Sequence, residues 1–206
     1  MEKYLRAGSS FARRQYAPHL FITLLFCVMS VFFVSFRNLD DFQAAKVMEM
    51  YVSFAGILLM TPLFFPEQNP EIWLLKKSKA TPLWHLYLIR LLMAVFFLAV
   101  IVTGFTQMMR QGDSQFDMRN LWIGSFCEMF FLGSIGFFVS GITNQAVLGY
   151  MVSVLYFVAN IGAAKYLGKF ALFQMAKGQY DFMVPMTAAA LLLVTGGIVL
   201  RERISA

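Results

Sequence analysis

The chain has 206 residues, of which 59% are hydrophobic and only 14% are charged. With a positive mean hydropathy of +0.66, this composition excludes an ordinary soluble protein and predicts a polytopic membrane protein, with one transmembrane domain over residues 1–206. The net charge of +6 does not indicate nucleic acid, because most Lys and Arg flank hydrophobic segments, where they set orientation and contact lipid headgroups.

The first predicted element is an interfacial helix over residues 1–18. Its basic residues are combined with an apolar side that includes Tyr4, Leu5 and Phe11. This pattern is typical of helices that lie in the membrane surface. The alternative is a plain basic flank that keeps the following segment on the cytoplasmic side.

Two membrane spans are predicted next. Residues 20–36 carry no charge, and as a helix they would measure about 25 Å, just enough to cross a bilayer. A polar loop over residues 37–46 leads to a second span over residues 48–65. Thr61 and Pro62 predict a kink near the end of that span, because proline cannot donate a helical hydrogen bond.

A polar interruption over residues 66–90 follows the second span. Asn69 suits an N-cap and Pro70 suits the first helical position, so a helix over residues 69–80 is predicted. Its apolar side chains come first and are followed by a basic end: Ile72, Trp73, Leu74, Leu75, Lys76, Lys77 and Lys79. On the cytoplasmic side, such an apolar face needs a cover, which is either a pocket of a partner protein or the membrane surface.

Four more spans are predicted over residues 83–109, 121–142, 145–164 and 182–200. Arg90 is expected to extend from the third span back toward the headgroups. Before the last span, residues 165–181 are too polar to cross but contain an apolar run, which predicts a short re-entrant helix in the outer leaflet. The predicted fold is an all-α membrane protein with six transmembrane helices and both termini cytoplasmic.

Two acids lie inside predicted spans, where a carboxylate is costly. Glu49, near the outer end of the second span, is interpreted as a residue at interface depth. For Glu128, two turns into the fourth span, three roles stay open: pairing with a Lys or Arg of a neighbouring helix, lining a polar cavity, and binding a cationic substrate group. Both acids are candidate residues of a translocation path.

The sequence predicts no catalytic, metal or cofactor site on this chain. His19 and His85 lie in different segments without the spacing of metal ligands. Gly168 and Lys169 lack the upstream glycine and the following Ser or Thr of a phosphate loop. The chain is therefore not expected to be an enzyme, and an active transporter built on it would bind ATP and magnesium on a partner subunit.

The layout resembles the permease subunits of type-2 ABC exporters over nearly the whole chain. The shared features are six spans, a basic amphipathic start, a capped helix between spans two and three, and a re-entrant segment before the last span. Within the interruption, the residues also resemble a loose family pattern of an acid, a leucine-rich helix, a small-polar-Pro turn and an arginine that enters span three: Glu67, Glu71, Ile72, Leu74, Leu75, Ser78, Thr81, Pro82, Trp84, Leu86 and Arg90.

This resemblance implies a mechanism as well as a fold. The helix between spans two and three would be a coupling helix that docks on a separate ABC-type ATPase subunit through Glu71, Ile72, Trp73, Leu75 and Lys76. Two copies of the chain, or one copy and a sibling permease, would enclose the path of a hydrophobic or amphipathic substrate such as a peptide, a drug or a lipid. The alternatives are a substrate-capture subunit of an energy-coupling importer and a non-transporting accessory membrane protein.

Overall fold

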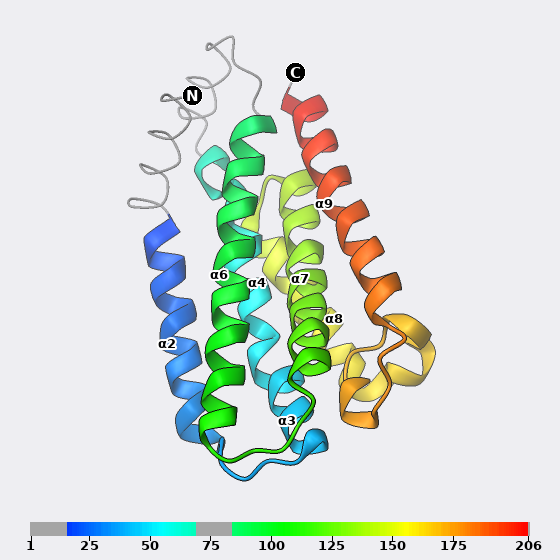
Figure 1. Ribbon diagram of the computed structural model, residues 1–206. Helices are drawn as coiled ribbons and strands as arrows, with labels where there is room; N and C mark the ends of the chain where they lie inside the picture. The colour runs from blue at the N-terminus through cyan, green and yellow to red at the C-terminus, as the bar shows by residue number, and fades with distance from the viewer. Residues whose placement is uncertain (1–15, 69–83, 206) are drawn as a thin grey trace.

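A computed structural model describes residues 16–68 and 84–205, which are almost entirely helical and contain no strand (Figure 1). Most of the predicted interfacial helix and all of the predicted coupling helix at 69–80 lie outside the described residues.

The described chain contains several helices that could cross a membrane. Four segments are long and apolar enough: Asp41–Gln68, α6 (Trp84–Gln111), α7 (Met118–Thr143) and Met183–Arg203 of α9 (Met183–Ser205). A fifth is α8 (Ala146–Leu167), if the part before its bend is counted together with the part after it. Another apolar helix, α2 (Ala17–Phe33), is shorter. The all-helical prediction is thus confirmed for the described residues, and the four to five helices that could span a membrane are consistent with a multi-pass membrane protein.

The segment Asp41–Gln68 combines three kinds of helix in four consecutive pieces. It consists of α3 (Asp41–Val47), the π-helix η2 (Met48–Val52), α4 (Phe54–Met60) and the 3-10 helix η3 (Thr61–Gln68). At Thr61 and Pro62, where a kink is predicted, the α-helix gives way to the 3-10 helix. The loop predicted up to residue 46 is wrong from Asp41 onward, because Asp40 caps the helix by accepting a 2.7 Å hydrogen bond from the backbone N–H of Gln43.

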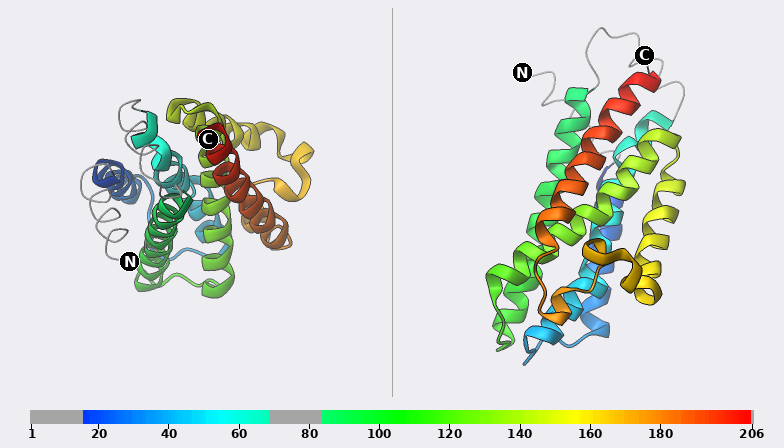
Figure 2. Two further views of the ribbon diagram at one scale, coloured as in Figure 1. Left: turned by 90° about the horizontal axis from the view of Figure 1, so that it is seen from above. Right: turned by 90° about the vertical axis from the view of Figure 1, so that its right-hand side faces the viewer.

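Helix α7 lies at the centre of the bundle and packs against α4, α6, α8 and α9 (Figure 2). The outward faces of α2 and α9 are apolar: Phe32 is 80% exposed and Val184 is 79% exposed. Large apolar side chains on an outer surface fit contact with lipid rather than with water.

The bundle has two distinct ends. We call one the anchor end, where Gln68, Trp84, Asn144 and Arg201 lie. We call the other the loop end, where the connection after α2 meets the connection after α6 through backbone hydrogen bonds, from the N–H of Asn38 to Gly112 (2.8 Å) and from the N–H of Gln115 to Leu39 (2.9 Å).

Residues 168–182, which we call the re-entrant segment, also lie at the loop end. The helical path bends by 108° between Gly162 and Ala164, and the chain then forms two 3-10 turns, η4 (Gly168–Phe170) and η5 (Met175–Lys177). The prediction of a helix here is wrong in form, because Gly168 and Gly178 adopt positive φ and end the helical turns. The apolar run nevertheless packs inward, with Leu172 and Met175 buried.

Candidate functional site

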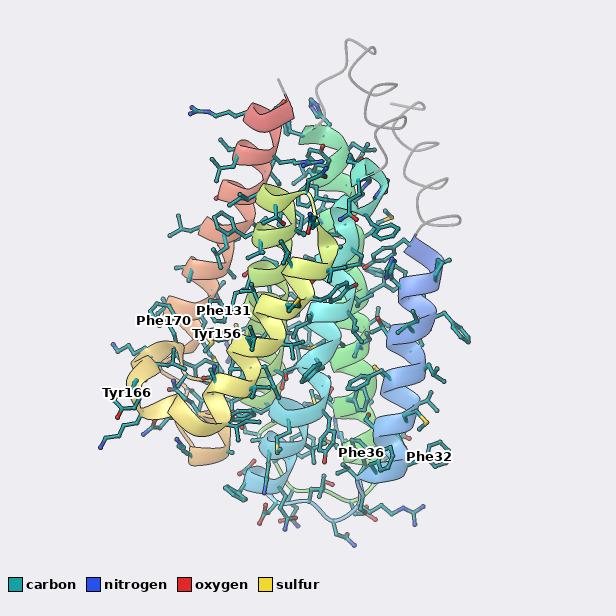
Figure 3. The ribbon with its side chains drawn as sticks, turned by 180° about the vertical axis from the view of Figure 1, so that it is seen from behind. Phe32, Phe36, Phe131, Tyr156, Tyr166 and Phe170 are labelled. Carbon is teal, nitrogen blue, oxygen red and sulfur yellow. The ribbon has the colours of Figure 1, made fainter. Side chains whose placement is uncertain are left out.

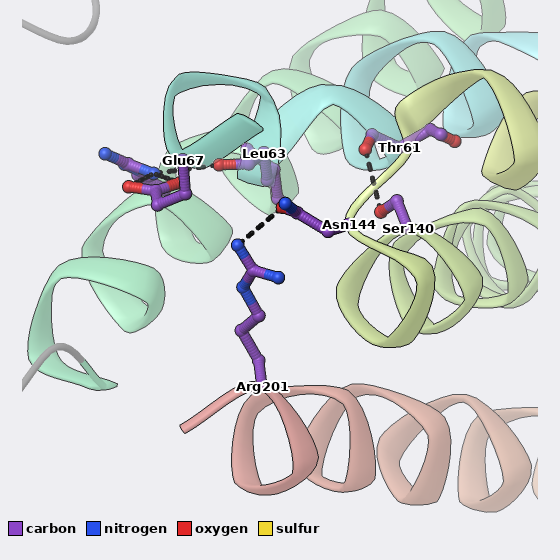
Figure 4. Close-up of polar contacts among 7 residues, drawn as sticks. Thr61, Leu63, Glu67, Ser140, Asn144 and Arg201 are labelled. Carbon is purple, nitrogen blue, oxygen red and sulfur yellow. Dashed lines mark hydrogen bonds and ion pairs between the residues drawn. The ribbon is translucent and has the colours of Figure 1, made fainter. Parts of the chain in front are cut away.

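The anchor end contains a buried ion pair between Glu67 of η3 and Arg90 of α6, whose side chains are 0% and 3% exposed. Arg90 Nη1 donates to the two carboxylate oxygens of Glu67 at 3.0 and 2.9 Å, and to the backbone oxygen of Leu63 at 2.9 Å (Figure 4). The prediction that Arg90 extends to the headgroups is therefore wrong. Its charge is compensated within the protein, because an acid is buried beside it.

A second arginine joins helices at the same end. Arg201, in the last turns of α9, is buried, and its Nη2 donates a 2.6 Å hydrogen bond to Oδ1 of Asn144 (Figure 4). Asn144 ends α7 in the left-handed conformation that asparagine tolerates. The Arg201 guanidinium also lies 5.9 Å from the ring centre of Phe64 in η3, within the range of a cation–π contact. Arg201 therefore connects α9 to η3 and to the α7–α8 turn.

A third contact fixes the point at which the second span changes from α-helix to 3-10 helix. Ser140 Oγ of α7 donates to the backbone oxygen of Thr61 at 3.1 Å and lies 3.0 Å from the backbone oxygen of Phe137. Since the 3-10 turn leaves backbone oxygens without their usual helical donors, a neighbouring hydroxyl stabilises the change.

These contacts bracket the stretch 69–83. Glu67 precedes the stretch by two residues, Arg90 follows it by seven, and the ion pair ties its two flanks together. The residues predicted to dock on an ATPase fall inside this stretch and lie outside the described residues: Glu71, Ile72, Trp73, Leu75 and Lys76. The described residues of this candidate site are thus the ones that join the flanks of the stretch 69–83 to the bundle.

At the loop end, the structure brings together the two acids singled out from the sequence. Glu49 of η2 and Glu128 of α7 are both 0% exposed, and their carboxyl groups face each other. Among the described residues, neither acid forms an ion pair with Lys or Arg, and no group of three potential metal ligands gathers. Three roles were open for Glu128, and the first of them, pairing with a Lys or Arg, is not observed among the described residues.

Glu49 binds the backbone of the re-entrant segment. Its Oε1 accepts a hydrogen bond from the N–H of Met175 at 2.6 Å, and its Oε2 accepts one from the N–H of Ala176 at 3.2 Å. These two backbone donors compensate the burial of Glu49 inside the protein. The interpretation of Glu49 as a residue at interface depth stays a prediction.

Two side chains of α8 support the same segment. Asn160 Oδ1 accepts a 2.8 Å hydrogen bond from the N–H of Leu172, and the Tyr156 hydroxyl donates a 2.6 Å hydrogen bond to the backbone oxygen of Phe170. Figure 3 shows Tyr156 and Phe170 close to Phe131 of α7, and the ring centres of Phe131 and Tyr156 are 5.6 Å apart. The segment is therefore attached at four backbone positions.

A pocket of about 300 Å³ adjoins Glu49 between α3, α8 and the re-entrant segment. Most of its lining is apolar, and Lys46 and Lys177 also line it. Glu49 is the one acid in this lining, so the pocket adjoins one member of the carboxyl pair.

The two acids stand out in the sequence, but the polar residues that bind the re-entrant segment or join the helices at the anchor end do not. Tyr156 and Asn160 are one helical turn apart within an apolar span, so the i, i+4 spacing of two polar residues could have indicated a shared face. For Arg201 and Asn144, which are 57 residues apart, no local pattern indicates the contact. Comparison of the chain with family models, curated proteins and solved structures gives no match.

Proposed function

We propose that this chain is the transmembrane permease subunit of a type-2 ABC exporter. Together with a second copy or a sibling permease it would form the path of a hydrophobic or amphipathic substrate, driven by a separate ATPase that binds ATP and magnesium. The observation that supports this proposal is the buried Glu67–Arg90 ion pair, which joins the two flanks of the stretch 69–83. A segment that receives force from a partner must be rigidly attached to the helices that it moves.

In this proposal, force enters at the coupling helix predicted over residues 69–80. Closure of two ATPase subunits on ATP would displace that helix, and the anchor end would pass the displacement to the spans. Arg90 belongs to α6, Glu67 to the second span, and Arg201 to α9, so three helices respond together. The bundle would then alternate between inward-facing and outward-facing arrangements.

The proposed orientation places six spans in the cell membrane, with the anchor end and both termini in the cytoplasm. On that assignment the cytoplasmic side carries ten Lys and Arg: Lys3, Arg6, Arg13, Arg14, Lys76, Lys77, Lys79, Arg90, Arg201 and Arg203. The other seven lie outside, and an excess of positive charge on the inner side is the usual bias of membrane proteins.

The experiment is purification of the full chain from its native membranes, with identification of the bound proteins and measurement of ATP hydrolysis. We expect an ABC-type ATPase together with two permease chains. Trp73→Ala and Glu71→Ala should each reduce recovery of the ATPase at least about tenfold, since buried aromatic and charged residues carry much of the binding free energy of an interface.

Glu202→Ala is the matched control for Glu71→Ala, because it removes the same charge near the same end of the protein, from a half-exposed position. It should leave recovery of the ATPase unchanged. Purification without an ATPase would contradict the proposal, as would full recovery with both Trp73→Ala and Glu71→Ala. One copy of the chain bound to an ATPase through an unrelated membrane subunit would favour the importer instead.

A further inference from the structure

The Glu49–Glu128 pair has an uneven set of hydrogen-bond partners. Both oxygens of Glu49 accept backbone N–H groups, from Met175 and Ala176. Neither oxygen of Glu128 has a hydrogen-bond partner among the described residues, and the polar groups that face Glu128 are the Glu49 carboxyl and the backbone N–H of Phe173. Because donors favour the ionised form of a carboxyl group, the negative charge belongs on Glu49.

The neutral member of the pair is then Glu128. Two carboxyl groups that face each other away from water do not both ionise, since repulsion and loss of hydration oppose the second charge. A single proton on Glu128 provides an O–H donor toward Glu49 and leaves one charge, which the two backbone N–H groups stabilise. The geometry therefore accounts for both acids without an ion pair to Lys or Arg among the described residues.

The segment that Glu49 holds is in a strained conformation. Phe173 has a φ of 64°, in the left-handed region that an aromatic residue rarely adopts, and its ring packs edge-on against Phe157 at 5.5 Å. Such a conformation persists only while surrounding contacts fix it. The hydrogen bonds to Met175 and Ala176, two and three residues further on, are among those contacts.

The charged member of the pair lies beside open space. The pocket of about 300 Å³ is lined by Glu49, whereas Glu128 is not part of its lining. A proton from a hydronium ion in this space would therefore meet Glu49 first. Its transfer forms one O–H bond on Glu49 and releases water, with no other covalent change.

Other titratable groups face the pair from the elements packed around it. They are Lys46 of α3, Cys127 of α7, Tyr156 of α8, and Lys177 and Tyr180 of the re-entrant segment. Side chains of these types ordinarily titrate above pH 8. Burial, with a smaller contribution from nearby acids, raises the pKa of Tyr180 further. Two further acids, Asp41 and Asp117, line the space beside Met175 and Tyr180, and aspartate side chains in water ordinarily titrate at about pH 4. A transition between pH 8 and pH 5 at the Met175 and Ala176 amides would therefore report Glu49 and Glu128.

We propose that Glu49 and Glu128 form a proton-binding pair that holds the re-entrant segment against the bundle, and that a second proton, bound by Glu49, releases residues 171–177. The neutral carboxyl group is a weaker acceptor for the Met175 and Ala176 N–H groups than the carboxylate, so the segment leaves its strained conformation. This inference goes beyond the proposed function and requires no ATPase partner.

The test is hydrogen exchange of the full chain in lipid nanodiscs between pH 8 and pH 5, with rates corrected for the intrinsic effect of pH. A hydrogen bond to a charged acceptor protects an amide roughly 10- to 100-fold. The amides of Met175 and Ala176 should lose protection by about this factor at pH 5. The Gln115 amide, which donates to the backbone of Leu39 at the same end, should keep its protection.

Two variants with the same carboxyl-to-amide change separate the roles of the acids. Glu49→Gln should expose the Met175 and Ala176 amides at every pH, at least about tenfold above the natural chain at pH 8. Glu128→Gln should keep them protected at pH 8, because the amide can still donate to Glu49. Loss of protection across α7 would show that Glu49→Gln does not fold. In that case the proposal is tested by the exchange rates of the natural chain between pH 8 and pH 5 and by those of Glu128→Gln at pH 8. The proposal is overturned by equal rates in folded Glu49→Gln and the natural chain at pH 8, by loss of protection in Glu128→Gln at pH 8, or by pH-independent rates in the natural chain.

Discussion

The charge of Arg90 is compensated by Glu67 inside the protein, although α6 starts only a few residues earlier and the side chain is long enough to reach water. Such burial gains little net free energy, because loss of hydration offsets most of the attraction between the charges. Removal of one partner alone is strongly destabilising, since the other charge remains buried and uncompensated. The pair is thus better suited to fixing one geometry than to raising stability.

Arg90→Met should therefore lower the free energy of unfolding by about 3–5 kcal/mol, because the Glu67 carboxylate is left buried without its partner. The measurement is a denaturant titration of the purified chain in mild detergent, followed by circular dichroism. Arg110→Met removes the same group from an exposed position and should cost less than about 0.5 kcal/mol.

The double variant Glu67→Leu with Arg90→Met should recover most of the stability lost in Arg90→Met, since no charge is then left in the apolar site. Equal stabilities of Arg90→Met and Arg110→Met would show that the ion pair does not matter for folding. A double variant that is less stable than Arg90→Met alone would also contradict this interpretation.

Among single residues, the sequence predicted which ones are unusual but not what they contact. Glu49 and Glu128 stand out because carboxylates are costly in apolar spans. Their proximity depends on how the second span packs on α7, and the backbone donors of Met175 and Ala176 depend on where the re-entrant segment returns. Neither follows from local spacing, so the sequence alone predicts neither the contact of Glu49 with the re-entrant segment nor that of Arg90 with Glu67.

At the level of helices, α4, α7 and α8 approach one another through glycines. A Cβ atom on Gly56 of α4 would overlap the backbone carbonyl of Met129 in α7, and one on Gly133 would lie 2.6 Å from the backbone oxygen of Gly56. On α8, a Cβ on Gly149 would lie 2.5 Å from the backbone oxygen of Gly136. In membranes, where the hydrophobic effect does not drive helices together, such close backbone contact is a main source of association.

Gly56→Ala should lower the free energy of unfolding by about 1–3 kcal/mol, because the added methyl group forces α4 and α7 apart along rigid backbone. Gly104→Ala is the control, since a Cβ at that position in α6 meets nothing within 4 Å. It should be neutral or raise stability by about 0.5–1 kcal/mol, because alanine favours the helix. Both are measured by the same denaturant titration, and equal effects of the two substitutions would argue against close packing at Gly56.

The positions of most helices follow from composition, whereas their irregularities do not. Apolar runs located α6, α7, α8 and α9 to within a few residues, and Pro62 indicated the change of helix type at Thr61. The π-helix at Met48–Val52 has no proline or glycine to indicate it. It was therefore missed, together with the earlier start of the helix at Asp41.

For the molecule as a whole, the two candidate regions lie at opposite ends of the bundle and act on different parts of it. The anchor end joins η3, α6, α9 and the α7–α8 turn, while the loop end holds the re-entrant segment against η2 and α8. Helix α7 reaches both ends, since Glu128 and Ser140 belong to it. Helix α7 is therefore an element that contacts both the anchor end and the carboxyl pair.

The proposed function requires the anchor end to face the cytoplasm, and this orientation can be measured directly. Lys169→Cys places a thiol at an exposed position of the loop end, and Arg203→Cys places one at an exposed position near the anchor end. The natural Cys27 and Cys127 are buried and should react little. A membrane-impermeant maleimide added to intact cells should label Lys169→Cys at once, and Arg203→Cys only after the membrane is opened.

Gln115→Cys, in the α6–α7 connection, provides a second exposed site at the loop end and should behave like Lys169→Cys. Agreement of these two sites would show that the loop end as a whole lies outside, including the lysines that line the pocket beside Glu49. The reverse labelling pattern would place the stretch 69–83 outside the cell, where no ATPase could bind it. It would remove the exporter proposal while leaving the proton-binding pair intact, because the hydrogen bonds from Met175 and Ala176 to Glu49 do not depend on orientation.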